Sequence, residues 1–340
     1  MKYQITQIPQ YIPRQDYMDL VDRIVSQFSE MPEVDSIYQV GSIKNPGISD
    51  LDIIVVFKDN EAVKLNYRAS ISEYEKQILT HGLFGTSVSL FQESMTYSVF
   101  SNYNKLYSSK KSSLDKMPAL RISAENKIQI AMEYLLRMWI TLVVQKSFMV
   151  FKLRSLLLEI KALSYDLELL GVKGGKLYEM VNEIIDLRNQ WFRQSWGPDR
   201  ICIWLESFIR VLREELQGYF KKFRFVIPYD HFKIARNIII REGNELEYKV
   251  KGVSQLSHFY NILGSKYFSL MNRLNTFQFY VPSEIVLPRS SQYKRFCYLH
   301  KHLIYNKMYL PHFGILGTSL RMDDGLLRME TSRPKVPPSF

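Results

Sequence analysis

Cysteine and several common catalytic motifs are scarce or absent in this sequence of 340 residues. The two cysteines, Cys202 and Cys297, lie far apart and belong to no CxxC or CxxH pair, so neither a zinc site nor a disulfide framework is indicated. The glycine-rich P-loop and the nucleophile motif of serine hydrolases are missing as well. These absences exclude several enzyme classes and favour a reducing compartment.

A membrane-length apolar run is also absent. The most apolar region, residues 128–153, is interrupted by Glu133, Arg137, Gln145 and Lys146, which favours a long buried helix or helical hairpin over a transmembrane segment. The first residues lack the apolar stretch that a secretory signal needs. We therefore expect a cytoplasmic protein without a transmembrane segment.

Acidic residues are the minority among the charged ones. The 45 lysines and arginines exceed the 34 aspartates and glutamates, giving a net charge of +11 that favours polyanionic partners such as nucleotides, RNA, acidic glycans or anionic membrane surfaces. The basic residues form short dispersed clusters and no long stripe, so a nucleic-acid partner is possible but not favoured. A hydrophobic content of 46% predicts a folded chain with two or three domains.

Two aspartates stand at the start of the clearest strand signal in the chain. Residues 51–57 form an apolar, β-branched run that predicts a buried strand, and Asp50 and Asp52 lie at its beginning. Because side chains alternate along a strand, residues two apart project from the same face, so both carboxylates point to one place. Carboxylate oxygens are ligands that magnesium prefers, and the pair therefore predicts a site for Mg²⁺ or Mn²⁺.

A small-residue turn precedes this strand. Residues 36–40 predict another short strand, which runs directly into Gly41 and Ser42. Glycine lets the backbone approach a ligand closely, such a turn can direct N–H groups at an anion, and the Ser42 hydroxyl adds a donor. The Asn-Pro-Gly segment at 45–47 then reverses the chain. The turn and the aspartates therefore predict a single site for a triphosphate and its metal ion.

Gly41-Ser42, a short loop, Asp50-Leu51-Asp52 and the apolar strand that follows resemble the signature of the polymerase-beta-like nucleotidyltransferase superfamily. The resemblance covers residues 14–100. It implies that Gly41 and Ser42 bind the phosphates of an NTP substrate, and that Asp50 and Asp52 are catalytic ligands of the divalent ions. The implied reaction moves an NMP to a hydroxyl or phosphate acceptor with release of pyrophosphate, and we favour a small-molecule or sugar-type acceptor.

The superfamily also has a third carboxylate, usually on a later strand. Here we predict that strand at residues 86–91, which carry no acid; Ser89 stands where the acid would sit, and Glu93 follows the strand. The six histidines, His81 among them, are scattered and indicate no metal site. Three alternatives therefore stay open: catalysis with two carboxylates or with Glu93 as a third, a catalytically lapsed nucleotide-binding or protein-interaction module, and an RNA-directed nucleotidyltransferase.

The predicted fold class is α/β (α+β), with three regions. Residues 1–105 form a nucleotidyltransferase-type mixed sheet with flanking helices, including one predicted within residues 60–80. Apolar residues at three-and-four spacing predict four or five helices in a domain at residues 120–222. A smaller mixed α/β region at residues 223–340 follows, with a β-hairpin predicted at Gly243-Asn244.

One further motif lies in the helical region. Arg188-Asn189 resembles the start of an RNase motif found in helical domains fused to small nucleotidyltransferases, but the histidine that ends this motif is missing. We therefore interpret Arg188 and Arg193 as solvent-facing or salt-bridging arginines and predict no nuclease activity.

Overall fold

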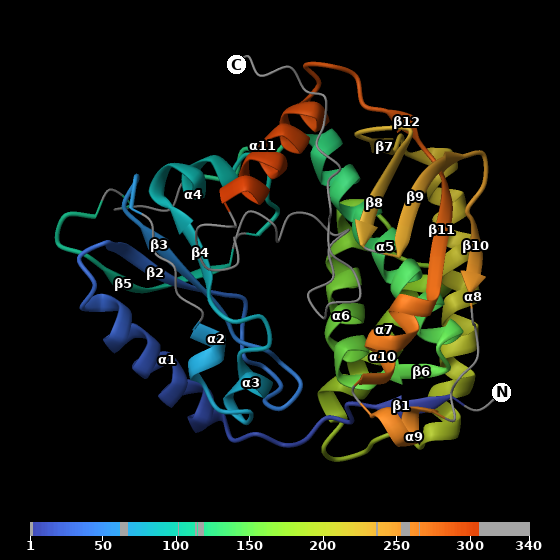
Figure 1. Cartoon of the computed structure of the whole chain (residues 1–340), viewed down its shortest axis with the longest axis horizontal. Coiled ribbons are helices and arrows are strands. Elements are labelled where there is room, and N and C mark those ends of the chain that lie inside the picture. The colour runs from blue at the N-terminus through green and yellow to red at the C-terminus, as the bar shows by residue number, and fades with distance from the viewer. Residues whose placement is uncertain are drawn as a thin grey trace.

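A computed structural model describes residues 3–61, 67–100, 102–112, 114, 119–235, 237–252, 259–264 and 266–305. These residues form a mixed α/β protein, and the predicted fold class is confirmed. Figure 1 shows two bodies side by side: a sheet with flanking helices from the first part of the chain, and a helical bundle that carries a second sheet. None of the helices in the described part of the chain combines the length and apolarity that a membrane span requires.

The first body is built on a four-stranded mixed sheet. In order across the sheet, its strands are β4 (Phe84–Ser87), β3 (Asp52–Phe57), β2 (Val34–Val40) and β5 (Tyr103–Ser108). β2 runs antiparallel to both β3 and β5, whereas β4 runs parallel to β3. The start of β3, with its aspartates, therefore lies beside the start of β4 and the end of β2.

Both faces of this sheet are covered. The helix α1 (Arg14–Ser29) packs on the face that carries Ile53, Val55 and Phe57, and the helix α4 (Val88–Ser94) packs on the face of Ile54 and Val56. Because β3 is buried on both faces, its sequence is a continuous apolar run without alternating polar residues.

Two local predictions in this body are wrong. The strand expected at 86–91 ends at Ser87, and α4 begins at Val88, where Asp59 accepts hydrogen bonds from the backbone N–H (3.0 Å) and the hydroxyl (2.6 Å) of Ser89. The helix expected within residues 60–80 is replaced by two single turns, α2 (Tyr67–Ser70) and α3 (Glu75–Ile78), while residues 62–66 lie outside the described ones. The N–H of Ser72 donates to the Glu75 carboxylate, and the N–H of Glu75 donates to the Ser72 hydroxyl. This reciprocal pair of hydrogen bonds caps α3 as a separate helix.

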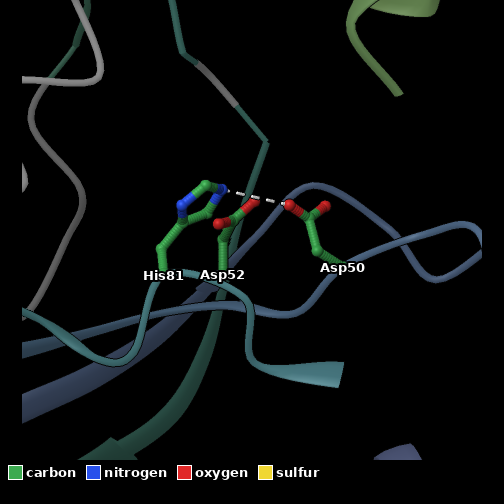
Figure 2. A group of neighbouring side chains, drawn as sticks. All are labelled: Asp50, Asp52 and His81. Atoms are coloured by element: carbon green, nitrogen blue, oxygen red, sulfur yellow. Dashed lines mark ion pairs between the residues drawn. The ribbon is translucent and has the colours of Figure 1, made fainter. Parts of the chain in front are cut away.

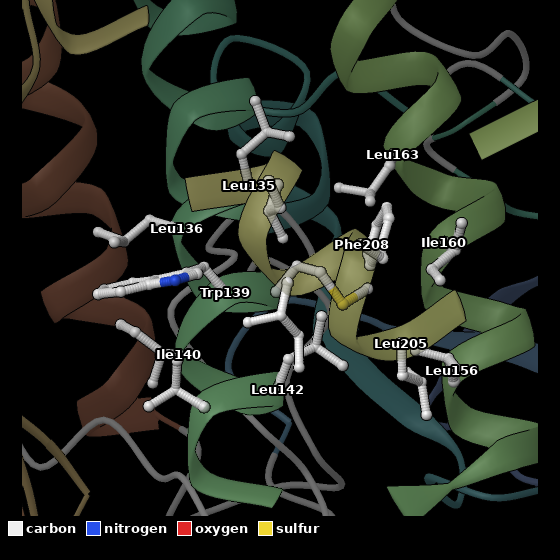
Figure 3. Close-up of a cluster of buried hydrophobic side chains, with 14 of the residues drawn as sticks. Leu135, Leu136, Trp139, Ile140, Leu142, Leu156, Ile160, Leu163, Leu205 and Phe208 are labelled. Atoms are coloured by element: carbon white, nitrogen blue, oxygen red, sulfur yellow. The ribbon is translucent and has the colours of Figure 1, made fainter. Parts of the chain in front are cut away.

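The second body contains four long helices, in agreement with the predicted four or five: α5 (Ala124–Ser147), α6 (Leu153–Leu169), α7 (Lys176–Gln190) and α8 (Pro198–Lys222). Figure 3 shows part of their apolar core, where Phe208 of α8 lies beside Ile160 and Leu163 of α6, whereas Trp139 of α5 points away from them. The strand β1 (Gln4–Thr6) belongs to this body by pairing, because it runs parallel to β6 (Val150–Lys152). The chain then crosses to α1 in the first body.

A second sheet covers the helical bundle. Its order is β10 (Glu247–Gly252), β11 (Asn275–Pro282), β9 (Ile238–Gly243) and β8 (His231–Ala235). The hairpin predicted at Gly243-Asn244 is wrong, because β11 inserts between β9 and β10 and buries Phe277, Phe279 and Val281 against the bundle. A strand with one face fully apolar is stabilised best at the centre of a sheet, and the more exposed β10 takes the edge.

The remaining elements complete this body. They are β7 (Val226–Ile227), which pairs with β12 (Glu284–Ile285), and the helices α9 (Tyr260–Leu263), α10 (Lys266–Leu274) and α11 (Ser291–Tyr305). The helix α11 also contacts the first body, because the ring of Tyr298 lies 4.8 Å from that of Tyr97 between their centroids. Residues 306–340 of the predicted C-terminal region lie outside the described residues.

Candidate functional site

Three side chains of types that can bind a metal ion meet at the start of β3. Asp50, Asp52 and His81 each offer one ligand atom, and these atoms all lie within 4.8 Å of one another. Figure 2 shows the two carboxylates and the imidazole turned toward one another, with His81 Nε2 3.4 Å from Asp50 Oδ2. Two carboxylate oxygens and an imidazole nitrogen are ordinary ligands of divalent cations, so these residues fit a metal ion.

Strand register explains how His81 reaches this place. Ile54 of β3 pairs with Phe84 of the parallel strand β4, so two residues earlier Asp52 comes level with Gly82. The residues just before Gly82 therefore lie beside the aspartates. Thr80 donates a hydrogen bond to Asp50 Oδ2 at 3.3 Å, and the ring of His81 lies beside that of Phe84 with 6.2 Å between centroids.

The turn after β2 lies at the same edge of the sheet. Val40, the last residue of β2, pairs with Asp52, and Gly41 follows with a φ of +72° that side chains rarely tolerate. The N–H of Gly41 donates to the carbonyl of Asn102 at 3.0 Å, so this residue offers close backbone approach and not a free donor. A Cβ at Gly41 would meet no atom within 4 Å, and Ser42 is exposed. The space around Gly41 is therefore open, at the same edge of the sheet as the carboxylates.

Hydrogen bonds from α1 hold the loop between the turn and the aspartates. Tyr17 donates from its hydroxyl to the carbonyl of Ser49 at 2.7 Å and accepts from the N–H of Gly47 at 3.0 Å. Gly47 has a φ of +86°, and a Cβ there would lie 2.1 Å from the carbonyl oxygen of Gln10. This position therefore requires glycine, and the loop holds one conformation just before Asp50.

The helical body holds the same loop from the other side. Arg154 of α6 donates to the carbonyls of Ile48 (3.2 Å) and Ser49 (3.1 Å), and Arg188 of α7 donates to the Ser49 hydroxyl at 3.1 Å. Arg188 is only 4% exposed and has no ion-pair partner in the described part of the chain, so its interpretation as a solvent-facing or salt-bridging arginine is wrong. The sequence could not indicate this role, because it depends on how α7 packs against a distant loop.

Positive charge gathers around the carboxylates. Burial raises the pKa of Asp50, but the hydrogen bond and charge of His81 and the charge of Arg154 outweigh it, so this pKa lies below its usual value. Burial, followed by the charges of Arg188 and Lys44, lowers the pKa of Lys161, and Asp50 opposes that shift. These effects act between groups that are near one another. Cations from α6 and α7 therefore lie near enough to Asp50 to interact with its charge.

Glu93, a candidate third carboxylate, is not part of the cluster. It lies on α4, which begins beyond the end of β4, whereas Asp52 and His81 lie at the starts of β3 and β4. Glu93 instead lies close enough to Tyr97 and Tyr298 to help burial raise the pKa of both. The sequence interpretation missed His81, which a strand starting at Phe84 and running parallel to β3 would have indicated.

Comparison with known proteins adds no assignment. No protein-family model matches the chain, and no curated protein matches it in sequence. We therefore infer the function from the residues of this chain and their geometry.

Proposed function

We propose that this protein is a metal-dependent nucleotidyltransferase that moves an NMP from an NTP to a hydroxyl or phosphate acceptor and releases pyrophosphate. The observation that carries the proposal is the convergence of Asp50, Asp52 and the Gly41 turn at one edge of the sheet, with cations opposite them. The resemblance of this segment to the polymerase-beta-like superfamily supports the same reaction.

Asp50 and Asp52 would hold Mg²⁺ or Mn²⁺, and His81 lies close enough to join them. A divalent ion bound there neutralises charge on the reacting phosphate and lowers the pKa of the attacking oxygen. The protein's own task is to keep both carboxylates ionised and correctly directed. Against the effect of burial, His81 and Arg154 lower the pKa of Asp50 and so keep that carboxylate ionised at neutral pH.

The phosphates would lie between the turn and the helical body. Gly41 lets them approach the backbone, and the exposed hydroxyl of Ser42 supplies a donor. Lys44 and Lys161 would neutralise the outer phosphates, because a triphosphate needs more positive charge than the metal site supplies. Arg154 and Arg188 act differently: they hold the backbone and hydroxyl of Ser49, and so fix the direction of Asp50.

The acceptor is favoured to be a small molecule or a sugar. The experiment that tests the proposal supplies the purified protein with an NTP labelled with ³²P at either the α- or the γ-phosphate, together with Mg²⁺ or Mn²⁺ and a cell extract. We expect the α-label to become attached to an acceptor and the γ-label to appear only in pyrophosphate.

Two outcomes of this experiment would contradict the proposal. Transfer of the γ-label would indicate phosphoryl transfer. Metal-dependent NTP binding without attachment of either label, whatever NTP is offered, would favour the catalytically lapsed binding module. Transfer to RNA that weakens steeply with salt would instead keep the reaction and replace the favoured acceptor.

A further inference from the structure

We infer that His81 is the third protein ligand of the metal ion, and that this donor set of two carboxylates and one imidazole selects manganese over magnesium. The inference rests on the metal site of the proposed function, but it concerns which ion binds and not whether a nucleotide is transferred. The first ground is geometric. His81 comes from the segment before β4, and the two aspartates come from the start of the neighbouring strand β3.

The distances suit a shared ion. Ligand atoms of one ion lie roughly 3 to 4.5 Å from one another when each metal bond is about 2.1 Å long. The three side chains place their ligand atoms within 4.8 Å of one another, and His81 Nε2 lies 3.4 Å from Asp50 Oδ2. Small side-chain movements would therefore bring all three onto one ion.

The position of the imidazole is also held from outside the cluster. The His81 ring lies beside Phe84, a residue of β4 whose side chain is buried, and Thr80 holds Asp50 Oδ2 through its hydroxyl at 3.3 Å. The segment from Thr80 to Phe84 therefore positions both the imidazole and the Asp50 carboxylate that faces it. A site with prearranged ligands loses less conformational freedom when an ion binds.

The donor chemistry then discriminates between ions. Magnesium strongly prefers oxygen ligands, whereas manganese, which also suits carboxylates, is a transition metal that binds sites with mixed nitrogen and oxygen ligands as the first member of the Irving–Williams order. Replacing an oxygen ligand by a nitrogen therefore weakens magnesium binding more than manganese binding. No acid stands among residues 80–92 to restore an all-oxygen site at this end of β4.

The competing interpretation is that His81 is only the ion-pair partner of Asp50. In that case a metal ion would displace the imidazole, and no nitrogen would lie in the coordination shell. Pulsed electron paramagnetic resonance distinguishes the two, because a directly bound imidazole nitrogen modulates the Mn²⁺ signal.

The experiment uses the full chain without nucleotide. Mn²⁺ is titrated into wild-type protein, and the bound ion is examined for nitrogen coupling; growth on ¹⁵N-histidine then changes that coupling without any mutation. We expect one bound histidine nitrogen and displacement of Mn²⁺ only by a large excess of Mg²⁺. His81→Asp should remove the coupling and shift the Mn²⁺ to Mg²⁺ preference by about tenfold toward Mg²⁺.

Controls keep the inference falsifiable. His231→Asp, on β8 of the other body, should leave both the coupling and the preference unchanged. If His81→Asp does not fold, His81→Asn takes its place, because labelling with ¹⁵N-histidine alone reports any of the six histidines. Bound Mn²⁺ without histidine coupling, or Mg²⁺ bound as tightly as Mn²⁺, would overturn the inference. Nitrogen coupling without nucleotide transfer would leave it standing and reject the proposed function instead.

Discussion

Arg188 donates a hydrogen bond from its guanidinium to the hydroxyl of Ser49, the residue just before Asp50, over 3.1 Å. The arginine lies on α7 in the helical body, and the serine lies on the loop that leads into β3. The guanidinium is buried, and its Nε has no hydrogen-bond partner in the described part of the chain. A buried cation that keeps an unused donor beside two carboxylates is costly unless it orients the site or meets an anionic ligand.

We expect Arg188→Met to lower the rate of nucleotide transfer by at least tenfold while the fold is kept, because Met fills a similar volume but removes the hydrogen bond that ties the Ser49 hydroxyl to α7. Circular dichroism and the rate of α-label transfer provide the measurement. Arg193→Met, which replaces an exposed arginine close by, is the matched control. Wild-type transfer in the Arg188 variant would mean that the contact between α7 and the loop is only structural.

The paired aspartates carry the second prediction. Asp50→Asn combined with Asp52→Asn should reduce metal-dependent transfer by about a thousandfold or more, because amides cannot supply the negative charge that the ion requires. The melting temperature should stay close to that of wild type, since the two side chains lie at the edge of the sheet. Asp22→Asn, on the exposed side of α1, is the control. Undiminished turnover in the double variant would reject the site.

The turn after β2 carries the third prediction. Gly41→Val should weaken NTP binding sharply, because its side chain would occupy the open space at the turn, where the proposed function places the phosphates. Gly171→Val is a closely matched control: Gly171 has a φ of +71°, against +72° at Gly41, and open space around it, but it lies in the turn after α6. Both variants should lose about 1 to 2 kcal/mol of folding free energy from backbone strain. Equal NTP affinity in the two, measured by calorimetry, would contradict the assigned role of the turn.

The fourth prediction concerns the carboxylate that the cluster leaves out. Glu93→Gln should change the transfer rate by less than about threefold, because Glu93 lies on α4 and outside the metal cluster. Steady-state rates at saturating NTP give the comparison. If this variant loses activity by orders of magnitude while still binding NTP, Glu93 is the third carboxylate after all.

The proximity of Asp50 and Asp52 agrees with the sequence pattern, although β3 begins only at Asp52 and strand alternation does not extend to Asp50. The pairing of Val40 with Asp52 places the Gly41 turn at the same edge of the sheet. The contacts that hold the loop before Asp50, from Tyr17, Arg154 and Arg188, are not contained in this local pattern.

The rest of the site depends on contacts that local patterns do not contain. His81 reaches the aspartates only through the parallel register of β3 and β4, and Arg188 reaches Ser49 only through the packing of α7. The same reason explains the wrong strand boundary, since α4 is capped by Asp59, thirty residues before Ser89. It also explains the wrong hairpin, since β11 comes from a later part of the chain to separate β9 from β10.

The central claim is that Asp50, Asp52 and the Gly41-Ser42 turn hold a metal-bound NTP between the two bodies. Crystals grown with Mn²⁺ and an NTP analogue that cannot be cleaved between its α- and β-phosphates would test it most directly, through anomalous scattering at the manganese edge. The account predicts a manganese peak between the Asp50 and Asp52 carboxylates, with the triphosphate lying along the turn toward Lys44 and Lys161. A manganese ion bound elsewhere, or an analogue seated away from the turn, would contradict it.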